Sequence, residues 1–168
     1  MAEWTEEHII GSIAQVGGCR TEAIALGQRL CTRHPPRSPS PLAARGLTDI
    51  TRLVEGQVQG SGIGNGLATI FCRHTSASLL IQENASPAAH RDIAAYFERV
   101  APEGGDYEHD AEGPDDMPAH LRTALTQTQL TIPLIEGALA LGRWQGIFLF
   151  EHRRAPQERQ IVVHVIGE

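Results

Sequence analysis

The stretch Leu130-Thr-Ile-Pro-Leu-Ile135, followed by Glu136-Gly137 and Ala138-Leu-Ala-Leu141, decides the class of fold. Two short apolar runs joined by a two-residue turn are typical of a β-hairpin, whose strands run antiparallel. Downstream, apolar and polar side chains alternate over residues 144–152, and residues 159–166 predict a closing strand. The last third of the chain therefore predicts an antiparallel sheet.

Upstream of this hairpin, extended segments are mixed with helical ones. Residues 67–81 predict one long strand or two collinear strands, interrupted by the polar run His74-Thr75-Ser76. Residues 22–32 fit a half-buried strand, with a helix as the alternative, and residues 5–14 fit a short helix. Strands and helices do not alternate regularly, so this order favours an α+β fold over a parallel α/β fold.

Three helices are predicted between these strands. The first has apolar side chains at helical spacing over residues 50–58, and Thr48 or Asp49 can cap it. Ser86 followed by Pro87 predicts the start of a second helix, whose buried stripe consists of Ile93, Phe97 and Val100. Pro118 opens a third helix through Leu125. We therefore predict mainly antiparallel β-sheets with two to four helices in a single domain.

The basic residues are all arginines: the 168-residue chain has 14 of them and no lysine. A Walker-type phosphate loop, a pyridoxal Schiff base and a lysine general base are therefore excluded. Twenty acidic residues give a net charge of -6, which argues against nucleic acid as a partner. A bias of composition explains the missing lysines as well as a functional reason does.

The cysteines and the apolar runs indicate a cellular location. The chain has three cysteines, Cys19, Cys31 and Cys72, without a C-x-x-C pair, which fits a reducing compartment better than a disulfide framework. It has no 18-residue apolar run, and its N-terminus lacks the basic and apolar regions of a signal peptide. We therefore expect a cytoplasmic protein without a membrane partner.

An acidic loop between the second and third helices is the first candidate site. Seven of the 20 acidic residues lie between 103 and 116, and His109 and His120 flank most of them. Imidazole nitrogens with nearby carboxylates suit zinc, nickel or manganese better than magnesium, which prefers sites made of oxygen ligands alone. The alternative is a solvated acidic loop with two surface histidines.

Other polar residues are candidates for which a structural role is the more usual explanation. His74 interrupts an apolar strand, and it is either a hydrogen-bonded core histidine or a third metal ligand or general base. The hydroxyls of Ser76 and Ser78 could hold a phosphate, although such strand breaks are common. Arg122 and Arg143 could bind an oxyanion, but most arginines lie at the surface.

Four runs of the sequence closely resemble the YjbQ-like family, in the family's order. They are Arg45–Thr51, His74–Pro87, Tyr107–Arg122 and Leu141–Gly146. The resemblance extends over residues 45–168, whereas residues 1–44 match poorly and contain an N-terminal extension and the first strand region. It implies a compact α+β homotrimer. It also implies metal ligands at His74, His109 and His120, and pocket residues at Glu83, Asn84, Asp92, Trp144 and Gln145.

The resemblance further implies a transferase, a secondary thiamine-phosphate synthase that joins hydroxymethylpyrimidine diphosphate to thiazole phosphate. There are two alternatives: a metal-dependent hydrolase with a three-histidine site, and a non-catalytic protein that binds a metal or a phosphometabolite. The expected partner is a small phosphorylated metabolite, and the expected cofactor is zinc, with magnesium, manganese or nickel as alternatives. We assign His74, Glu83 and Asp92 as candidate catalytic residues. The candidate binding residues are Ser76, Ser78, Asn84, Arg122, Arg143, Trp144 and Gln145.

Overall fold

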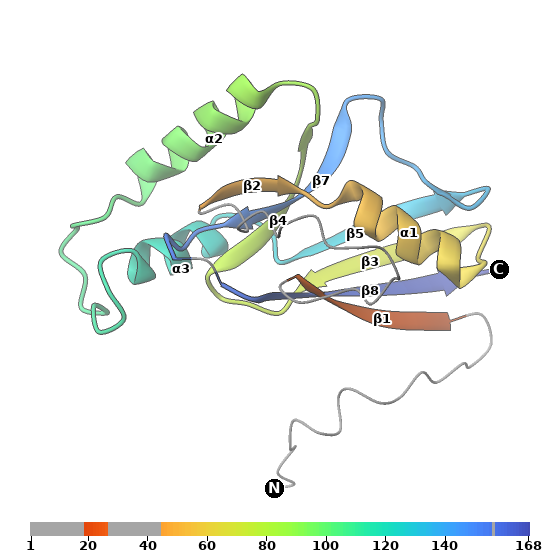
Figure 1. Ribbon diagram of the computed structural model, residues 1–168, viewed down its shortest axis with the longest axis horizontal. Helices are drawn as coiled ribbons and strands as arrows, with labels where there is room; N and C mark the ends of the chain where they lie inside the picture. The colour runs from red at the N-terminus through yellow and green to blue at the C-terminus, as the bar shows by residue number, and fades with distance from the viewer. Residues whose placement is uncertain (1–18, 27–44, 156) are drawn as a thin grey trace, which may run out of the picture.

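The structure, a computed structural model, describes residues 19–26, 45–155 and 157–168. In these ranges eight strands and three helices follow the order β1-β2-α1-β3-β4-α2-α3-β5-β6-β7-β8 (Figure 1). Every pair of neighbouring strands is antiparallel. The predicted α+β class is therefore confirmed. The predicted helix 5–14 and residues 27–32 of the predicted element 22–32 lie outside the described residues.

The larger sheet, sheet A, has five strands in the order β1-β8-β3-β5-β6. The predicted hairpin joins β5 to β6, and its turn residues Glu136 and Gly137 have φ angles of 52° and 79°. Positive φ at both positions suits a two-residue turn because its twist then matches that of the strands. The strands of sheet A are Cys19–Leu26 (β1), Gly66–Cys72 (β3), Gln129–Ile135 (β5), Ala138–Leu139 (β6) and Arg159–Gly167 (β8).

The smaller sheet, sheet B, has the order β2-β7-β4. Its strands are Gly46–Asp49 (β2), Ala77–Glu83 (β4) and Gln145–Glu151 (β7). Because β3 and β4 belong to different sheets, the prediction of one long or two collinear strands over residues 67–81 is wrong. The chain changes sheet at residues 73–76, and the buried side chains of Ile70 and Leu79 then join one core. Packing two sheets face to face buries both apolar runs, which a single straight strand would not do.

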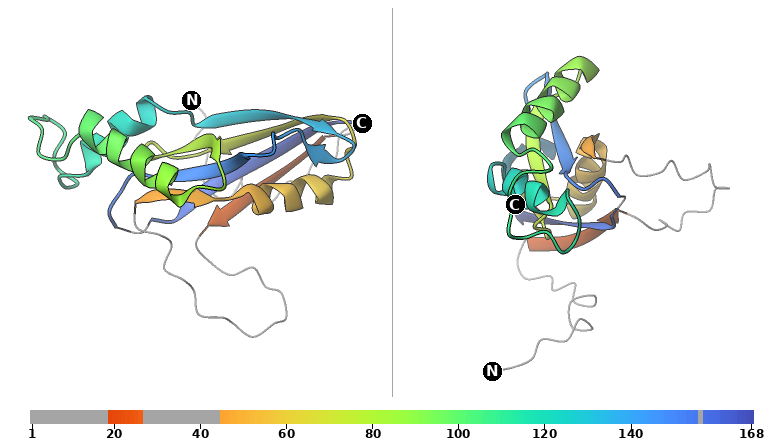
Figure 2. Two further views of the ribbon diagram at one scale, coloured as in Figure 1. Left: turned by 90° about the horizontal axis from the view of Figure 1, so that it is seen from above. Right: turned by 90° about the vertical axis from the view of Figure 1, so that its left-hand side faces the viewer.

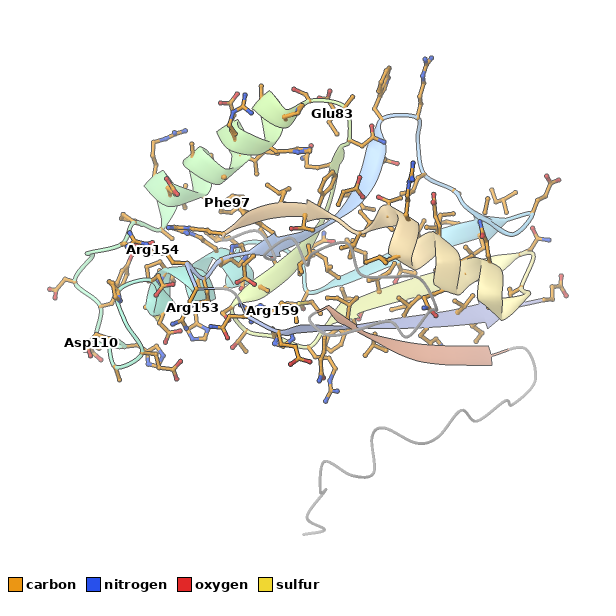
Figure 3. All side chains as sticks on the ribbon, viewed as in Figure 1. Glu83, Phe97, Asp110, Arg153, Arg154 and Arg159 are labelled. Carbon is orange, nitrogen blue, oxygen red and sulfur yellow. The ribbon has the colours of Figure 1, made fainter. Side chains whose placement is uncertain are left out.

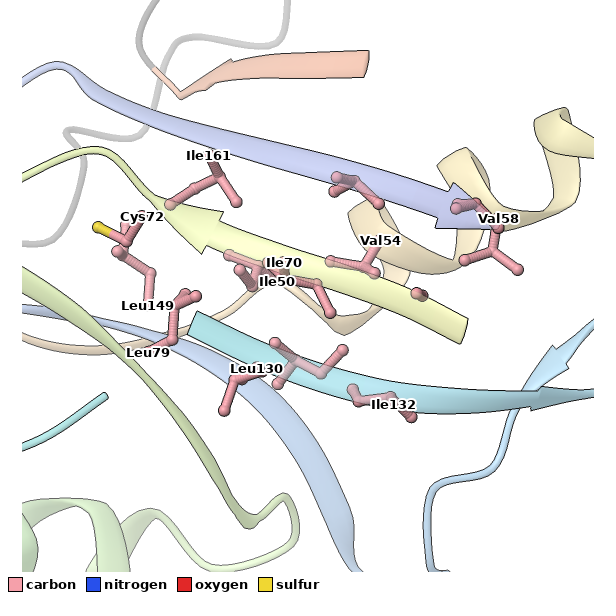
Figure 4. Packing of buried hydrophobic residues seen from close by; sticks show 14 of the residues in the cluster. Ile50, Val54, Val58, Ile70, Cys72, Leu79, Leu130, Ile132, Leu149 and Ile161 are labelled. Atoms are coloured by element: carbon pink, nitrogen blue, oxygen red, sulfur yellow. The ribbon is translucent and has the colours of Figure 1, made fainter. Parts of the chain in front are cut away.

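The core lies between the two sheets and helix α1, Thr51–Ser61 (Figure 4). Val54 and Val58 of this helix are buried as its periodicity predicts, whereas Leu53 is 37% exposed. The N-cap residue is Ile50, whereas Thr48 or Asp49 was predicted. The carboxylate of Asp49 nevertheless accepts a hydrogen bond from the backbone N–H of Thr51 at 2.8 Å.

Helix α2, Pro87–Val100, lies against sheet B on the side away from sheet A (Figures 1 and 2). The predicted cap is present, because the Ser86 hydroxyl accepts a hydrogen bond from the Ala89 backbone N–H at 3.2 Å. No residue of α2 is fully buried, and Val100 is 45% exposed, so the predicted buried stripe is wrong for the single chain. The helix contacts the sheet through aromatic rings, and the ring centres of Phe97 and Phe150 are 5.3 Å apart. The rest of its apolar stripe remains partly exposed.

Helix α3, Asp116–Ala124, begins two residues before the predicted start at Pro118. It follows the acidic loop at the left end of the molecule in Figure 1, so the loop connects the two outer helices. Among the described residues, no helix is long and apolar enough to cross a membrane.

We expect Ser86→Ala to lower the free energy of unfolding by about 1 kcal/mol, because the Ala89 N–H loses its acceptor at the start of α2. Ser86→Asp retains a side-chain acceptor and should remain within about 0.5 kcal/mol of the unsubstituted protein. Urea unfolding at pH 7 measures both values. Equal stability of Ser86→Ala and the unsubstituted protein would show that this cap is not needed.

Candidate metal centre

The acidic loop between α2 and α3 is neutralised by arginines from distant parts of the chain. Glu103 pairs with Arg45 and with Arg154, and Arg154 follows β7. Arg153 bonds to Asp115 through Nε at 3.2 Å and also contacts Asp116. Figure 3 shows Arg153 and Arg154 at the loop end of the molecule. The concentrated negative charge of the sequence is therefore partly paired in the fold.

Three side chains at the start of α3 bring potential metal ligands together. One ligand atom from each of His109, Asp116 and His120 lies within 4.8 Å of the others. His109 Nε2 is 2.9 Å from Asp116 Oδ2, and His120 Nε2 is 3.6 Å from Asp116 Oδ1. The carboxylate of Asp116 is 2% exposed, whereas the two imidazoles reach solvent. The site thus has a buried charge beneath two accessible nitrogens.

A backbone carbonyl orients the His120 ring and holds one of its nitrogens. His120 Nδ1 lies 2.9 Å from the backbone oxygen of Thr75, and a carbonyl oxygen only accepts hydrogen bonds. Nδ1 therefore carries the proton, and in the neutral ring Nε2 presents a lone pair towards Asp116. Among the described residues, Asp116 Oδ2 forms no hydrogen bond of good geometry, although His109 Nε2 lies 2.9 Å from it. A buried carboxylate beside two imidazole nitrogens is an arrangement that a bound cation stabilises.

His74 does not join this cluster. It follows β3, and its Nε2 accepts a hydrogen bond from the backbone N–H of Gln160 at 2.6 Å. Burial, and then the positive charge of Arg159, lower the pKa of His74 below its usual value. The three-histidine set expected from the sequence is therefore replaced, in the described residues, by two histidines and a carboxylate.

The predicted phosphate hydroxyls are occupied by protein groups. Ser76 accepts a hydrogen bond from Arg159 at 3.1 Å, and the buried Ser78 bonds to His152 Nε2 at 2.9 Å. Arg122 is only 2% exposed and donates to the backbone oxygen of Ala101 at 2.6 Å. These three residues hold the fold together at this end of β4, and they do not form the open anion site predicted from the sequence.

The remaining predicted site residues lie at the opposite end of β4. This strand of seven residues is roughly 20 Å long, and Glu83 and Gln145 face one another at its far end. Figure 3 shows Glu83 well separated from Arg153 and Arg159. Glu83, Trp144 and Gln145 line a pocket of ≈ 600 Å³ there, while Asp92 lines an adjoining groove between α2 and β4. A single chain therefore divides the predicted site into two groups.

The connection between β6 and β7 lies beside this pocket and is ordered by side-chain hydrogen bonds. Asn84 donates from Nδ2 to the backbone oxygen of Gln145 at 3.3 Å, and Gln145 Oε1 accepts from the Gly142 N–H at 2.8 Å. The Arg143 guanidinium lies 4.9 Å from the centre of the Trp144 ring. Arg143 is exposed here, so it is not part of the cluster around Asp116.

Two residues of the metal centre were missed by the sequence prediction. Asp116 was one acid among seven, and it was not distinguished because the helix was expected to begin at Pro118. With the helix beginning at Asp116, the spacing to His120 is i,i+4, and both side chains lie on one face. Arg153 gave no local signal, since its partners are 37 and 38 residues away.

Comparison with known proteins identifies the family. The sequence model described as "UPF0047 protein YjbQ-like" matches residues 40–168. The chain belongs to the YjbQ-like (UPF0047) family. A UPF0047 protein of Synechocystis is 51% identical over 125 residues, which cover 74% of this chain and 85% of the relative. The YjbQ protein of Escherichia coli O157:H7 is 43% identical over 103 residues, 61% of this chain and 75% of the relative.

Solved structures of the family have the same fold. A protein from Sulfolobus solfataricus aligns with a TM-score of 0.75 and 28% identity, over 89% of this chain and 98% of that structure. A YjbQ/UPF0047 protein from Clostridium acetobutylicum aligns with a TM-score of 0.72 and 34% identity, over 86% of this chain and 99% of that structure.

The function expected from the family resemblance requires correction. The relatives are named only as UPF0047 proteins, and the Sulfolobus structure is described as a protein of unknown function. None of these names describes a thiamine-phosphate synthase. The assignment of that activity to this chain is therefore wrong, and the function has to be argued from the site.

The buried His152 should make the protein sensitive to acid. Burial, and then the positive charges of Arg159 and Arg45, lower the pKa of His152 from 6.5 to about 3. Between these two pH values the unfolded chain takes up a proton that the folded chain does not, so acid favours unfolding.

Lowering the pH from 7 to 5 should reduce the free energy of unfolding by about 2 kcal/mol through the protonation of His152 in the unfolded chain. His152→Gln removes the titration, so its loss of stability over that interval should be smaller by this amount. Urea unfolding of both proteins at the two pH values provides the comparison. Identical pH dependence in both would mean that His152 is not buried as a neutral ring.

Proposed function

We propose that this protein binds one divalent metal ion through His109, Asp116 and His120. The observation that carries the proposal is the approach of the His109 and His120 Nε2 atoms to the buried carboxylate of Asp116, while the Thr75 carbonyl holds the other nitrogen of His120. A ligand histidine commonly donates its other N–H to a backbone carbonyl, as His120 donates to Thr75. The ion would coordinate the two imidazoles and add positive charge beside the Asp116 carboxylate.

The types of ligand favour zinc among the divalent ions. Two imidazoles and one carboxylate are a common zinc ligand set, and manganese or nickel are the alternatives. Magnesium prefers oxygen ligands alone and fits less well. Three protein ligands leave at least one coordination position open, which is typical of zinc sites that bind a further molecule. His109 is 53% exposed and His120 is 31% exposed, so a small molecule in solvent can approach the ion.

The charges around the site support an anionic ligand bound by the metal itself. Arg153, Arg154 and Arg159 are each paired with a carboxylate, and Arg122 is buried against a carbonyl. These guanidinium groups are thus occupied by the protein. We propose a small phosphorylated metabolite as the ligand, with an oxygen of its phosphate on the open coordination position.

The unsubstituted protein should retain about one zinc ion per chain after dialysis, measured by elemental mass spectrometry. His120→Ala and Asp116→Asn should each weaken zinc binding by about 100-fold or more, because loss of a ligand exceeds the 10–100-fold effect of losing its support. His74→Ala is the matched control, since it also removes an imidazole, close to the start of β4 but outside the proposed site. It should change the affinity for zinc by less than about threefold.

Two results would contradict the site. One is an unsubstituted protein that binds no zinc, and the other is an equal loss in His74→Ala and His120→Ala. Inorganic phosphate added to the cobalt-substituted protein tests the open position, because a phosphate oxygen on the metal should change the visible absorption spectrum. An unchanged spectrum at saturating phosphate would argue against the anionic ligand.

We also propose that the chain assembles as a homotrimer. Several of its exposed large apolar side chains lie on two separate faces. Leu67, Phe71 and Ile166 lie on the outer face of sheet A, and Tyr96 and Leu125 border a groove of ≈ 710 Å³ between α2 and β4. Two different apolar faces on one chain suit a head-to-tail contact, which closes into a ring of identical subunits.

Light scattering after size-exclusion chromatography should give three times the 18.2 kDa mass of the chain. Phe71→Glu and Leu125→Glu should each yield monomers, because each places a charge on one of the two faces. A mixture of these two variants should form a heterodimer through the remaining intact faces. Leu53→Glu, on α1, is the control and should remain trimeric. A monomeric unsubstituted protein would refute the assembly.

The cysteine content supports a cytoplasmic location, which we propose as well. Cys72 is buried and unpaired, and burial raises the pKa of its thiol to about 11, so it remains a protonated, unreactive group. An odd number of cysteines without a C-x-x-C pair fits a reducing compartment. Fractionation of cells that produce the protein tests this location.

A further inference from the structure

The side chain of Arg153 is bonded by all three of its guanidinium nitrogens to the loop that carries the proposed metal ligands. Its Nε donates to Asp115 Oδ2 at 3.2 Å, and its Nη2 donates to the backbone oxygen of Glu112 at 2.9 Å. Its Nη1 contacts Asp116 Oδ1. The side chain is only 14% exposed. One guanidinium therefore holds residues 112–116 against the end of β7.

The same contact places a permanent positive charge beside the cation site. Asp116 Oδ1 faces both Arg153 Nη1 and His120 Nε2, while Asp116 Oδ2 faces His109. The three ligand atoms lie within 4.8 Å of one another, so an ion among them would lie only a few ångströms from the guanidinium. Arginine does not lose its proton in proteins, and like charges a few ångströms apart repel one another.

Arg153 has a second effect on the metal-free protein. A buried carboxylate without a compensating charge is strongly unfavourable, and Asp116 is 2% exposed. Arg153 supplies that compensation in the absence of metal. The guanidinium and the ion thus neutralise the same carboxylate, one by hydrogen bonding and the other by coordination.

The neighbouring arginine provides a comparison. Arg154 has the same charge, but its side chain is 66% exposed and pairs with Glu103. Its only contact with the Asp115 carboxylate is through the backbone N–H, at 2.8 Å, which a side-chain substitution leaves in place. The two adjacent arginines therefore differ in whether they contact Asp116.

We propose that Arg153 is a built-in counter-cation that competes with the metal ion for Asp116. It stabilises the metal-free site and lowers its affinity for divalent ions. Through its bonds to residues 112–116 it also couples occupancy of the site to the position of the acidic loop. This inference rests on the proposed metal centre. Arg153 acts through Asp116, so it is a positioning residue and not a ligand.

Zinc titrations at pH 7 against a competing chelator test the competition. Arg153→Gln should bind zinc at least about tenfold more tightly than the unsubstituted protein, because the competing charge is removed. Arg154→Gln makes the same change of charge one residue away, and it should stay within about threefold because it leaves Asp116 untouched. Arg153→Lys retains the charge and should bind like the unsubstituted protein. Unchanged or weaker binding in Arg153→Gln would overturn the proposal.

A measurement on the unsubstituted protein covers the case in which Arg153→Gln does not fold. The arginine Nε–H signals are followed by nitrogen-15 NMR, and Arg153 is identified by the signal lost in Arg153→Lys. Zinc should shift the Arg153 signal and leave that of Arg154 in place. An unmoved Arg153 signal in protein that has bound zinc would refute the competition alone. Absence of zinc binding in both the unsubstituted protein and Arg154→Gln would refute the metal centre itself.

Discussion

The buried carboxylate of Asp116, bonded to Arg153, is the interaction on which this end of the molecule depends. It joins the first residue of α3 to the residues that follow β7, so it fixes where the acidic loop returns to the sheet. With α3 held there, His120 reaches the backbone of Thr75, which belongs to the crossing between sheets A and B. The loop, the helix and the sheet crossing are thus positioned together, and the imidazoles of the candidate metal centre follow from that arrangement.

The exclusive use of arginine takes on a structural meaning here. A guanidinium can bond to several acceptors in one plane, whereas an ammonium group is a compact point charge. Arg153 contacts two carboxylates and a carbonyl, and Arg159 joins Glu151 to both the hydroxyl and the backbone of Ser76. These multiple contacts organise loops that have little apolar surface of their own. A bias of composition remains sufficient to explain the missing lysines, but the fold uses the geometry of the residue that replaced them.

Local patterns were predicted well, and long-range contacts were not. The hairpin at Glu136-Gly137 and the cap at Ser86 depend on residues within a few positions of each other, so the sequence reveals them. The approach of His109 to His120 was predicted from their position around one loop. By contrast, β2 is too short to show periodicity, and the change of sheet between β3 and β4 is decided by packing against the rest of the core. The roles of Arg153 and Arg122 depend on partners 21 or more residues away.

The most direct measurement of the central claim is anomalous X-ray diffraction from crystals of the zinc-loaded protein. The account predicts one zinc peak about 2.0–2.2 Å from a nitrogen of His109, a nitrogen of His120 and an oxygen of Asp116. His74 Nε2 should remain bonded to the backbone N–H of Gln160. A zinc peak at His74, or crystals in which His109, Asp116 and His120 hold no ion at saturating zinc, would contradict the account.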